Sequence, residues 1–210
     1  VDLESTGNQP MISHGKRYVI SFNGEIYNFK EIKKELLKTD PNLHFKSSGD
    51  TEVILALFEL FGVHEGIKRL RGMFAIAVWD QKNKTLNLAI DRAGEKPLYY
   101  GIINSILYFS SELKAIKKMV DNLSVSSQGI NIFLAQGNIP APLTIYNNFY
   151  KACPAEIITF QNAEKLQSDY YWLLDNESNY GYRHSFEDAS KRFEELFLNS
   201  VQEQMISDVS

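Results

Sequence analysis

The 210 residues carry a net charge of −4, and 44% of them are hydrophobic, a composition typical of an ordinary water-soluble domain with a substantial core. The acidic balance argues against a nucleic-acid partner, since nucleic-acid binders carry a basic face. The longest apolar stretch, Val53 to Val63, is too short to cross a bilayer, and the single cysteine, Cys153, excludes an internal disulfide, so we expect a cytoplasmic protein without a membrane partner.

The first part of the chain is predicted to form one strand and two helices. Residues 17–22 are rich in β-forming side chains, and residues 29–38 repeat apolar side chains at helical spacing. A second helix is expected over residues 51–61, with Asp50 in the N-cap position and Gly62 at its end.

The Asn23–Gly24 pair directly after the first strand has two interpretations. Both residues tolerate positive φ, so the pair is typical of a type I′ hairpin turn. The same pair could instead offer a side-chain N–H and an unobstructed backbone N–H to a developing oxyanion. Local sequence alone leaves both interpretations open.

After residue 72 the pattern changes to short β-rich runs joined by polar turns, which predicts an antiparallel meander. Two helices are expected to follow, over residues 112–120 and 127–137, and residues 144–160 are expected to be extended. Because helices and strands are segregated along the chain, the sequence predicts an α+β fold. The runs of the meander are 72–80, 85–91, 97–103 and 106–111.

The last part of the chain differs in composition. Residues 161–184 are polar and tyrosine-rich, which indicates an irregular linker. Ser185 to Asp188 then form a capping box that opens a long helix with an apolar stripe. Either this helix folds back on the first domain or it belongs to a longer protein.

Taken residue by residue, the catalytic signals are weak. The four histidines lie far apart, so a zinc site is not expected, and neither phosphate-binding glycine fingerprint is present. Cys153 has no base beside it and is interpreted as structural. The loop that contains Asp91 and Arg92 is interpreted as a turn pinned by a surface ion pair, Glu25 as a solvent-facing strand residue and Asp50 as a helix cap.

Eight motifs taken in order nevertheless resemble one family closely, the glutamine-hydrolysing asparagine synthases, in their N-terminal class II glutamine amidotransferase domain. Together they cover nearly the whole chain in the family's order and roughly its spacing. They are VDLESTGNQPM, SFNGEIYNF, SSGDTEVIL, LRGMFAIAVWD, DRAGEKPLYYG, FSSELKAI, GNIPAPLTIYNNFYKACPAE and NSVQEQMISDV.

The resemblance implies an Ntn-hydrolase fold, a four-layer αββα sandwich, which here would be incomplete. It implies that an N-terminal cysteine hydrolyses glutamine and that the ammonia passes to a second domain. That domain would use ATP and Mg²⁺ to amidate aspartate to asparagine, whereas no cofactor and no metal are expected in this chain. The resemblance also leaves a homodimer open.

The resemblance also assigns the site residues. Asn23 and Gly24 match the oxyanion-hole pair, while Glu25 and Asp50 match the residues that bind the amino-acid head of glutamine. Val1 matches the end of a segment that lines the same pocket. The nucleophilic N-terminal cysteine has no match, and Cys153 lacks the free α-amino group that would let it replace that cysteine.

We therefore expect a fragment truncated at both ends that is inactive alone. Its predicted parts are a glutaminase domain over residues 1–160 without its first strand, a linker over residues 161–184, and the first helix of an α/β ATP-pyrophosphatase (synthetase) domain over residues 185–210. Two alternatives stay open: an amidotransferase of a sugar acid in lipopolysaccharide or capsule biosynthesis, and a non-catalytic pseudo-glutaminase that binds glutamine.

Overall fold

Antiparallel strands form two sheets in the computed structural model, which describes residues 7–174 and 185–205. Within these ranges, the larger sheet has six strands in the order β1-β2-β3-β4-β8-β9, and the smaller has three in the order β6-β5-β7. The bounds in chain order are β1 Met11–Ile12, β2 Tyr18–Ile26, β3 Gly72–Asp80, β4 Thr85–Ile90, β5 Tyr99–Ile103, β6 Ile106–Ser110, β7 Phe149–Lys151, β8 Glu156–Gln161 and β9 Glu164–Tyr170.

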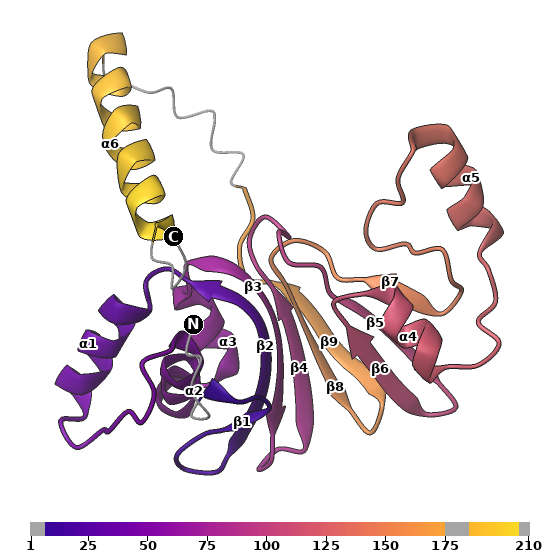
Figure 1. Cartoon of the computed structure of the whole chain (residues 1–210), viewed down its shortest axis with the longest axis horizontal. Helices are drawn as coiled ribbons and strands as arrows, with labels where there is room; N and C mark the ends of the chain where they lie inside the picture. Colours follow the sequence, from indigo (N-terminus) through magenta and orange to yellow (C-terminus); the bar gives the residue numbers. More distant parts are fainter. Residues whose placement is uncertain (1–6, 175–184, 206–210) are drawn as a thin grey trace.

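Helices cover the outer faces of both sheets (Figure 1). The larger sheet carries three helices on one side, and a helix packs on the smaller sheet. The helical bounds are α1 Phe29–Thr39, α2 Asp50–Phe61, α3 Val63–Arg69, α4 Leu113–Met119, α5 Ser127–Gln136 and α6 Phe186–Gln204. The chain is therefore α+β, as the sequence predicts.

The hydrophobic core is divided between the layers. One cluster joins α1, α2 and α3 to the larger sheet and contains Phe58 and Phe74, both fully buried. A second lies between the two sheets, and a third joins α4 to the smaller sheet. Helix, sheet, sheet and helix thus follow one another, because each sheet buries apolar side chains on both of its faces.

Most of the predicted elements are confirmed to within a few residues, but two expectations about them are wrong. The four β-rich runs do not form one meander, because β3 and β4 belong to the larger sheet while β5 and β6 belong to the smaller one. Gly62 ends α2 as expected, and a helix that the sequence did not predict, α3, begins directly after it at Val63. Periodicity identifies strands but does not say which sheet each strand joins.

The second wrong expectation concerns the predicted linker. Residues 164–170, within the segment 161–184, form β9 at an edge of the larger sheet. All seven side chains are exposed, so the strand lacks the apolar alternation that would reveal it in the sequence. The rest of that segment after residue 174 lies outside the described residues.

The loop after β4 is organised by a buried carboxylate rather than by a surface ion pair. Asp91 is 1% exposed and accepts hydrogen bonds from the backbone N–H groups of Phe74, Ala93, Glu95 and Lys96. The neighbouring Arg92 donates to backbone oxygens of the α3 end instead. The predicted ion pair is therefore wrong, and Asp91 ties the loop to β3.

Helix α6 stands away from the sheets (Figure 1). Ser185 caps it as predicted, since its Oγ accepts from the N–H of Asp188 at 3.1 Å. None of the described α6 side chains is buried, and Phe193 is 69% exposed. An ion pair of 3.0 Å between Arg71 and Glu203 joins the end of α6 to the rest of the molecule.

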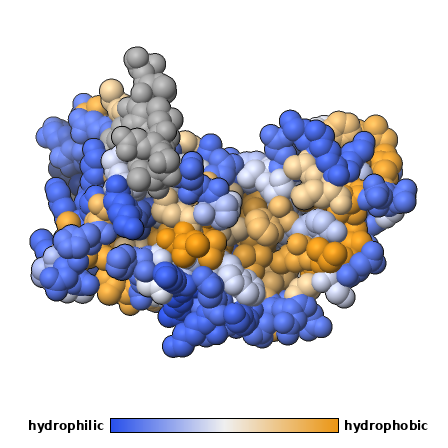
Figure 2. All heavy atoms as spheres, turned by 60° about the horizontal axis from the view of Figure 1, so that its bottom comes forward, coloured by the Kyte–Doolittle hydropathy of each residue, from blue (hydrophilic) through white to orange (hydrophobic). Residues whose placement is uncertain are grey.

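Apolar surface is also exposed at the other end of the molecule. Figure 2 shows orange areas at the right-hand end, where Figure 1 places α5 and the smaller sheet. On α5 the exposed large hydrophobic side chains are those of Ile130, Phe133 and Leu134. Among the described residues, no helix combines the length and hydrophobicity that a membrane span requires.

Candidate active site

The Asn23–Gly24 pair lies inside a strand and does not form a turn. Strand β2 pairs continuously with β3 from Tyr18, opposite Asp80, to Ile26, opposite Gly72. The hairpin interpretation is therefore wrong. Nine consecutive pairs with β3 hold this segment extended, a tertiary effect that overrides the local turn preference of Asn-Gly.

The structure explains why residue 24 is a glycine. Its φ is +155°, and a Cβ at this position would collide with the backbone oxygen of Met73 on β3. Any side chain would push β2 and β3 apart. Gly24 therefore lets the two backbones approach closely and leaves its own backbone uncovered.

The backbone N–H of Gly24 points to the open edge of β2. Strand β1 pairs only with Val19 and Ile20, so the later part of β2 has no neighbouring strand on that side among the described residues. The N–H of Phe22 donates to the side chain of Gln9 at this edge, and the N–H of Ile26 donates to Asp50. Because N–H direction alternates along a strand, the Gly24 N–H points the same way.

Asp50 reaches this edge from the first turn of α2. It does not cap the helix, because Gly49 is the N-cap residue and no side-chain cap bond forms, so the N-cap prediction is wrong. Its Oδ2 accepts from the N–H of Ile26 at 2.9 Å, and the residue is only 7% exposed. Burial raises the pKa of this carboxyl, and the bond from Ile26 opposes the rise only in part.

A cavity of about 140 Å³ joins Gly24 to Asp50. It is also lined by Gln9, Phe22 and Ser47, among others. Pockets for drug-sized ligands measure about 300–1,000 Å³, so this cavity suits a small polar group such as an amino-acid head. Two of the residues assigned by the resemblance thus meet in one small cavity.

The other assigned residues lie elsewhere. Asn23 and Glu25 are not among the residues that line the cavity, because strand alternation places their side chains on the opposite face from those of Phe22 and Ile26. Asn23 is exposed and its Nδ2 donates to Ser111 Oγ at 3.0 Å. Val1 lies outside the described residues.

Ser47 is a site residue that sequence reasoning missed. It is 7% exposed, it lines the cavity, and its hydroxyl has no hydrogen-bond partner among the described residues. Its backbone N–H donates to Glu52 Oε2 at 2.7 Å, which fixes the loop. Nothing in the sequence distinguishes Ser47 from its exposed neighbour Ser48, since the difference is one of burial.

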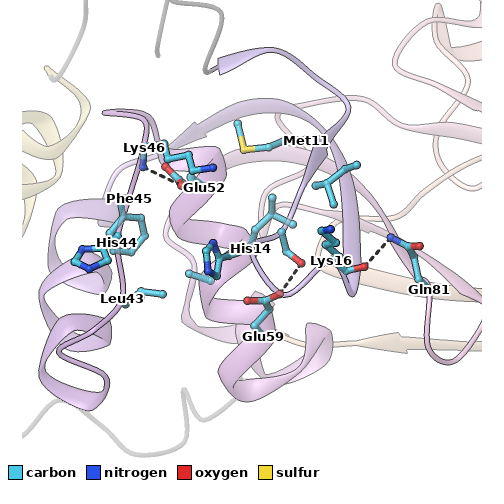
Figure 3. Close-up of a pocket in the computed structure, with 14 residues that line it drawn as sticks. Met11, His14, Lys16, Leu43, His44, Phe45, Lys46, Glu52, Glu59 and Gln81 are labelled. Atoms are coloured by element: carbon cyan, nitrogen blue, oxygen red, sulfur yellow. Dashed lines mark hydrogen bonds between the residues drawn. The ribbon is translucent and has the colours of Figure 1, made fainter.

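A larger cavity of about 630 Å³ lies beside this site (Figure 3). Its polar lining includes His14, Lys16 and His44, all exposed. The carboxylate of Glu59 already accepts bonds from Ser13 Oγ at 2.6 Å and from the N–H of Gly15 at 2.7 Å. None of the predicted site residues lines this cavity, so its size does not make it the candidate site.

Cys153 lines a third cavity, of about 700 Å³, between β5 and the β8–β9 hairpin. Its backbone N–H donates to Glu156 Oε2 at 2.7 Å. No predicted site residue lines that cavity, so Cys153 does not belong to the site at the edge of β2. Among the described residues, no three His, Cys, Asp or Glu side chains lie close enough together to hold a metal ion.

The fold and the residues at this edge define a class of protein. The structure matches a glutamine phosphoribosylpyrophosphate amidotransferase from Bacillus subtilis, solved in complex with ADP and GMP, with a TM-score of 0.55 and 19% identity over 79% of this chain and 32% of that chain. At this identity the match shows a shared fold. The model of the glutamine amidotransferase domain matches residues 1–172, so the chain belongs to that family.

Curated relatives narrow the class further. The chain is 34% identical over 213 residues to "Asparagine synthetase (glutamine-hydrolyzing) 3" of Bacillus subtilis, covering 100% of this chain and 33% of the relative. It is 34% identical over 161 residues to "Asparagine synthetase (glutamine-hydrolyzing) 1" of the same organism, covering 77% of this chain and 25% of the relative. The chain therefore spans a third or less of the length of these two relatives.

Proposed function

We propose that this chain is the glutaminase part of an asparagine synthase, which hydrolyses glutamine to supply ammonia for the ATP-dependent amidation of aspartate. The observation that carries the proposal is the convergence of the Gly24 N–H edge and the buried Asp50 carboxylate on one small cavity, in a chain of the glutamine amidotransferase family. The names of the curated relatives support asparagine as the product.

In this proposal each residue at the edge of β2 has a separate role. The Asp50 carboxylate pairs with the α-ammonium of glutamine, and Glu25 is the second carboxylate that the resemblance assigns to the amino-acid head. The Gly24 N–H donates to the oxyanion of the tetrahedral intermediate. The Asn23 amide is the second donor, and it exchanges its present bond to Ser111 for the substrate oxygen.

The nucleophile in this proposal is an N-terminal cysteine outside the chain. Cys153 does not serve, because it lines a different cavity from Gly24 and Asp50. We therefore expect the 210 residues alone to be inactive. As the resemblance implies, ATP and Mg²⁺ are assigned to a synthetase domain, and the cavity at Asp50 is too small for a nucleotide.

The test uses the full-length protein that carries this sequence. Supplied with aspartate, ATP, Mg²⁺ and either glutamine or ammonium, it should form asparagine from both nitrogen sources, and glutamine should yield one glutamate for each asparagine. Amino-acid analysis of the products measures both. Failure to form asparagine from either source would refute the proposal.

The same assay separates the two alternatives. Glutamate release without asparagine would favour an amidotransferase that acts on another carboxylate, such as a sugar acid. Glutamine binding in calorimetry without glutamate release would favour a pseudo-glutaminase. The predicted cytoplasmic location and the homodimer stay predictions.

A further inference from the structure

The hydroxyl of Ser47, which has no hydrogen-bond partner among the described residues, indicates how the substrate is held. A buried polar atom without a hydrogen bond costs about 1–3 kcal/mol, so native proteins satisfy nearly all such atoms. Among the side chains that the structure describes, Ser47 Oγ is the buried atom without a partner, and Ser47 lines the cavity that contains Asp50. Ser47 thus brings an unsatisfied hydroxyl to the wall of the cavity in which a ligand of Asp50 would lie.

Backbone hydrogen bonds to Glu52 fix the position of Ser47. Glu52, in the first turn of α2, accepts from the N–H of Lys46 at 3.0 Å and from the N–H of Ser47 at 2.7 Å. Figure 3 shows the first of these bonds beside the larger cavity. The two oxygens of Glu52 thus hold the loop, and Ser47 Oγ is left free for another partner.

The ligand chemistry follows from what Asp50 can offer. An ammonium group has three N–H donors and needs three acceptors. One oxygen of Asp50 already accepts from Ile26 at 2.9 Å, and the other has only a weak contact of 3.5 Å with Thr51 Oγ1. A single carboxylate partly used in this way leaves an ammonium short of acceptors, and a serine hydroxyl can accept one bond.

We propose that Ser47 is a further substrate-binding residue, whose hydroxyl accepts a hydrogen bond from the α-ammonium of glutamine beside Asp50. This proposal rests on the proposed function, since glutamine is the ligand in both. The head of the substrate would then have two contacts here, one with the Asp50 carboxylate at the start of α2 and one with the Ser47 hydroxyl in the loop before it.

The test substitutes Ser47→Ala in the full-length protein. Loss of one charge-assisted hydrogen bond should raise the KM for glutamine by roughly ten- to hundredfold with little change in kcat. Asparagine formation from ammonium should be unchanged, because that reaction does not use the glutamine site. The melting temperature should be unchanged or higher, since the removed hydroxyl has no partner to leave unpaired.

Two comparisons make the result specific. Ser48→Ala alters the exposed neighbouring serine and should leave the KM for glutamine as in the wild type. Glutaramate, which is glutamine without its α-amino group, should inhibit the Ser47→Ala variant and the wild type with equal inhibition constants. Weaker inhibition of the variant by glutaramate would refute the assignment to the ammonium.

The outcomes separate the two proposals. If the wild type turns over glutamine and Ser47→Ala has the same KM, this inference is wrong while the proposed function stands. If the wild type neither binds nor hydrolyses glutamine, the proposed function itself fails. A drop in the melting temperature together with equal losses of glutamine- and ammonium-dependent activity would show that Ser47 is structural.

Discussion

Asp50 is a buried carboxylate with a proposed binding role. Burial favours its neutral form, whereas pairing with an ammonium group requires its ionised form. Burial raises its pKa from the ordinary value of 3.8. Because the folded pKa is the higher one, the stability that this group contributes is full below about pH 3.8 and is lost as the pH rises through the folded pKa. At neutral pH the ionised Asp50 therefore destabilises the fold, a cost expected at a ligand site.

Asp50→Asn should stabilise the fold at neutral pH and weaken the binding of glutamine. At pH 7 the melting temperature should rise by about 2–4 °C, and the gain should disappear below about pH 3.8. Glutamine affinity in calorimetry should fall by at least about tenfold, because an ionic partner is lost. Asp121→Asn removes an exposed carboxylate and should change neither quantity. A lower melting temperature at pH 7 would show that burial is not the dominant effect.

At the scale of elements, Asp80 holds the β3–β4 turn and the start of β2 together. Its carboxylate accepts from Arg17 at 2.8 and 3.2 Å and from the N–H groups of Lys82 and Asn83 at 2.9 and 3.1 Å. Burial alone would raise its pKa, but the bonds from Arg17, Asn83 and Lys82 outweigh burial and lower it. The sequence predicts the turn, while the carboxylate that fixes it is visible only in the structure.

Asp80→Asn should lower the free energy of unfolding by about 1.5–3 kcal/mol at pH 7, because one amide oxygen cannot replace a carboxylate that accepts several bonds. The folded pKa is depressed, so the stability from Asp80 is present above the ordinary value of 3.8 and is lost as the pH falls through the folded pKa. Urea denaturation across this range measures the difference between variant and wild type, which should shrink in acid. Glu164→Gln, at the exposed start of β9, is the matched control.

At the scale of the whole molecule, an ion pair between Arg71 and Glu203 joins the end of α6 to the rest of the described chain. None of the described α6 side chains is buried, although Phe193 and Phe197 stack on each other with ring centroids 6.0 Å apart. Its capping box and apolar stripe match the helix that the sequence predicts. That this helix begins a synthetase domain stays a prediction.

Replacing both Phe193 and Phe197 with Gln should therefore leave the main unfolding transition of the 210-residue chain unchanged within about 1–2 °C. Phe58→Ala, in the core under the larger sheet, should in contrast cost about 3–5 kcal/mol. Thermal denaturation followed by circular dichroism compares the variants. A clear loss of stability in the double variant would mean that α6 packs on the sheets in solution.

The sequence by itself determined the kinds of element and the family, because both depend on local order along the chain: β-rich runs, helical spacing and eight motifs in sequence. The sequence could not decide whether Asn23–Gly24 is a turn. The strand that pairs with this segment at nine positions, β3, begins at Gly72, 48 residues after Gly24. It also could not distinguish Ser47 from Ser48, or see that Asp50 reaches the edge of β2. Those facts depend on burial and on contacts between distant segments, which only the tertiary structure fixes.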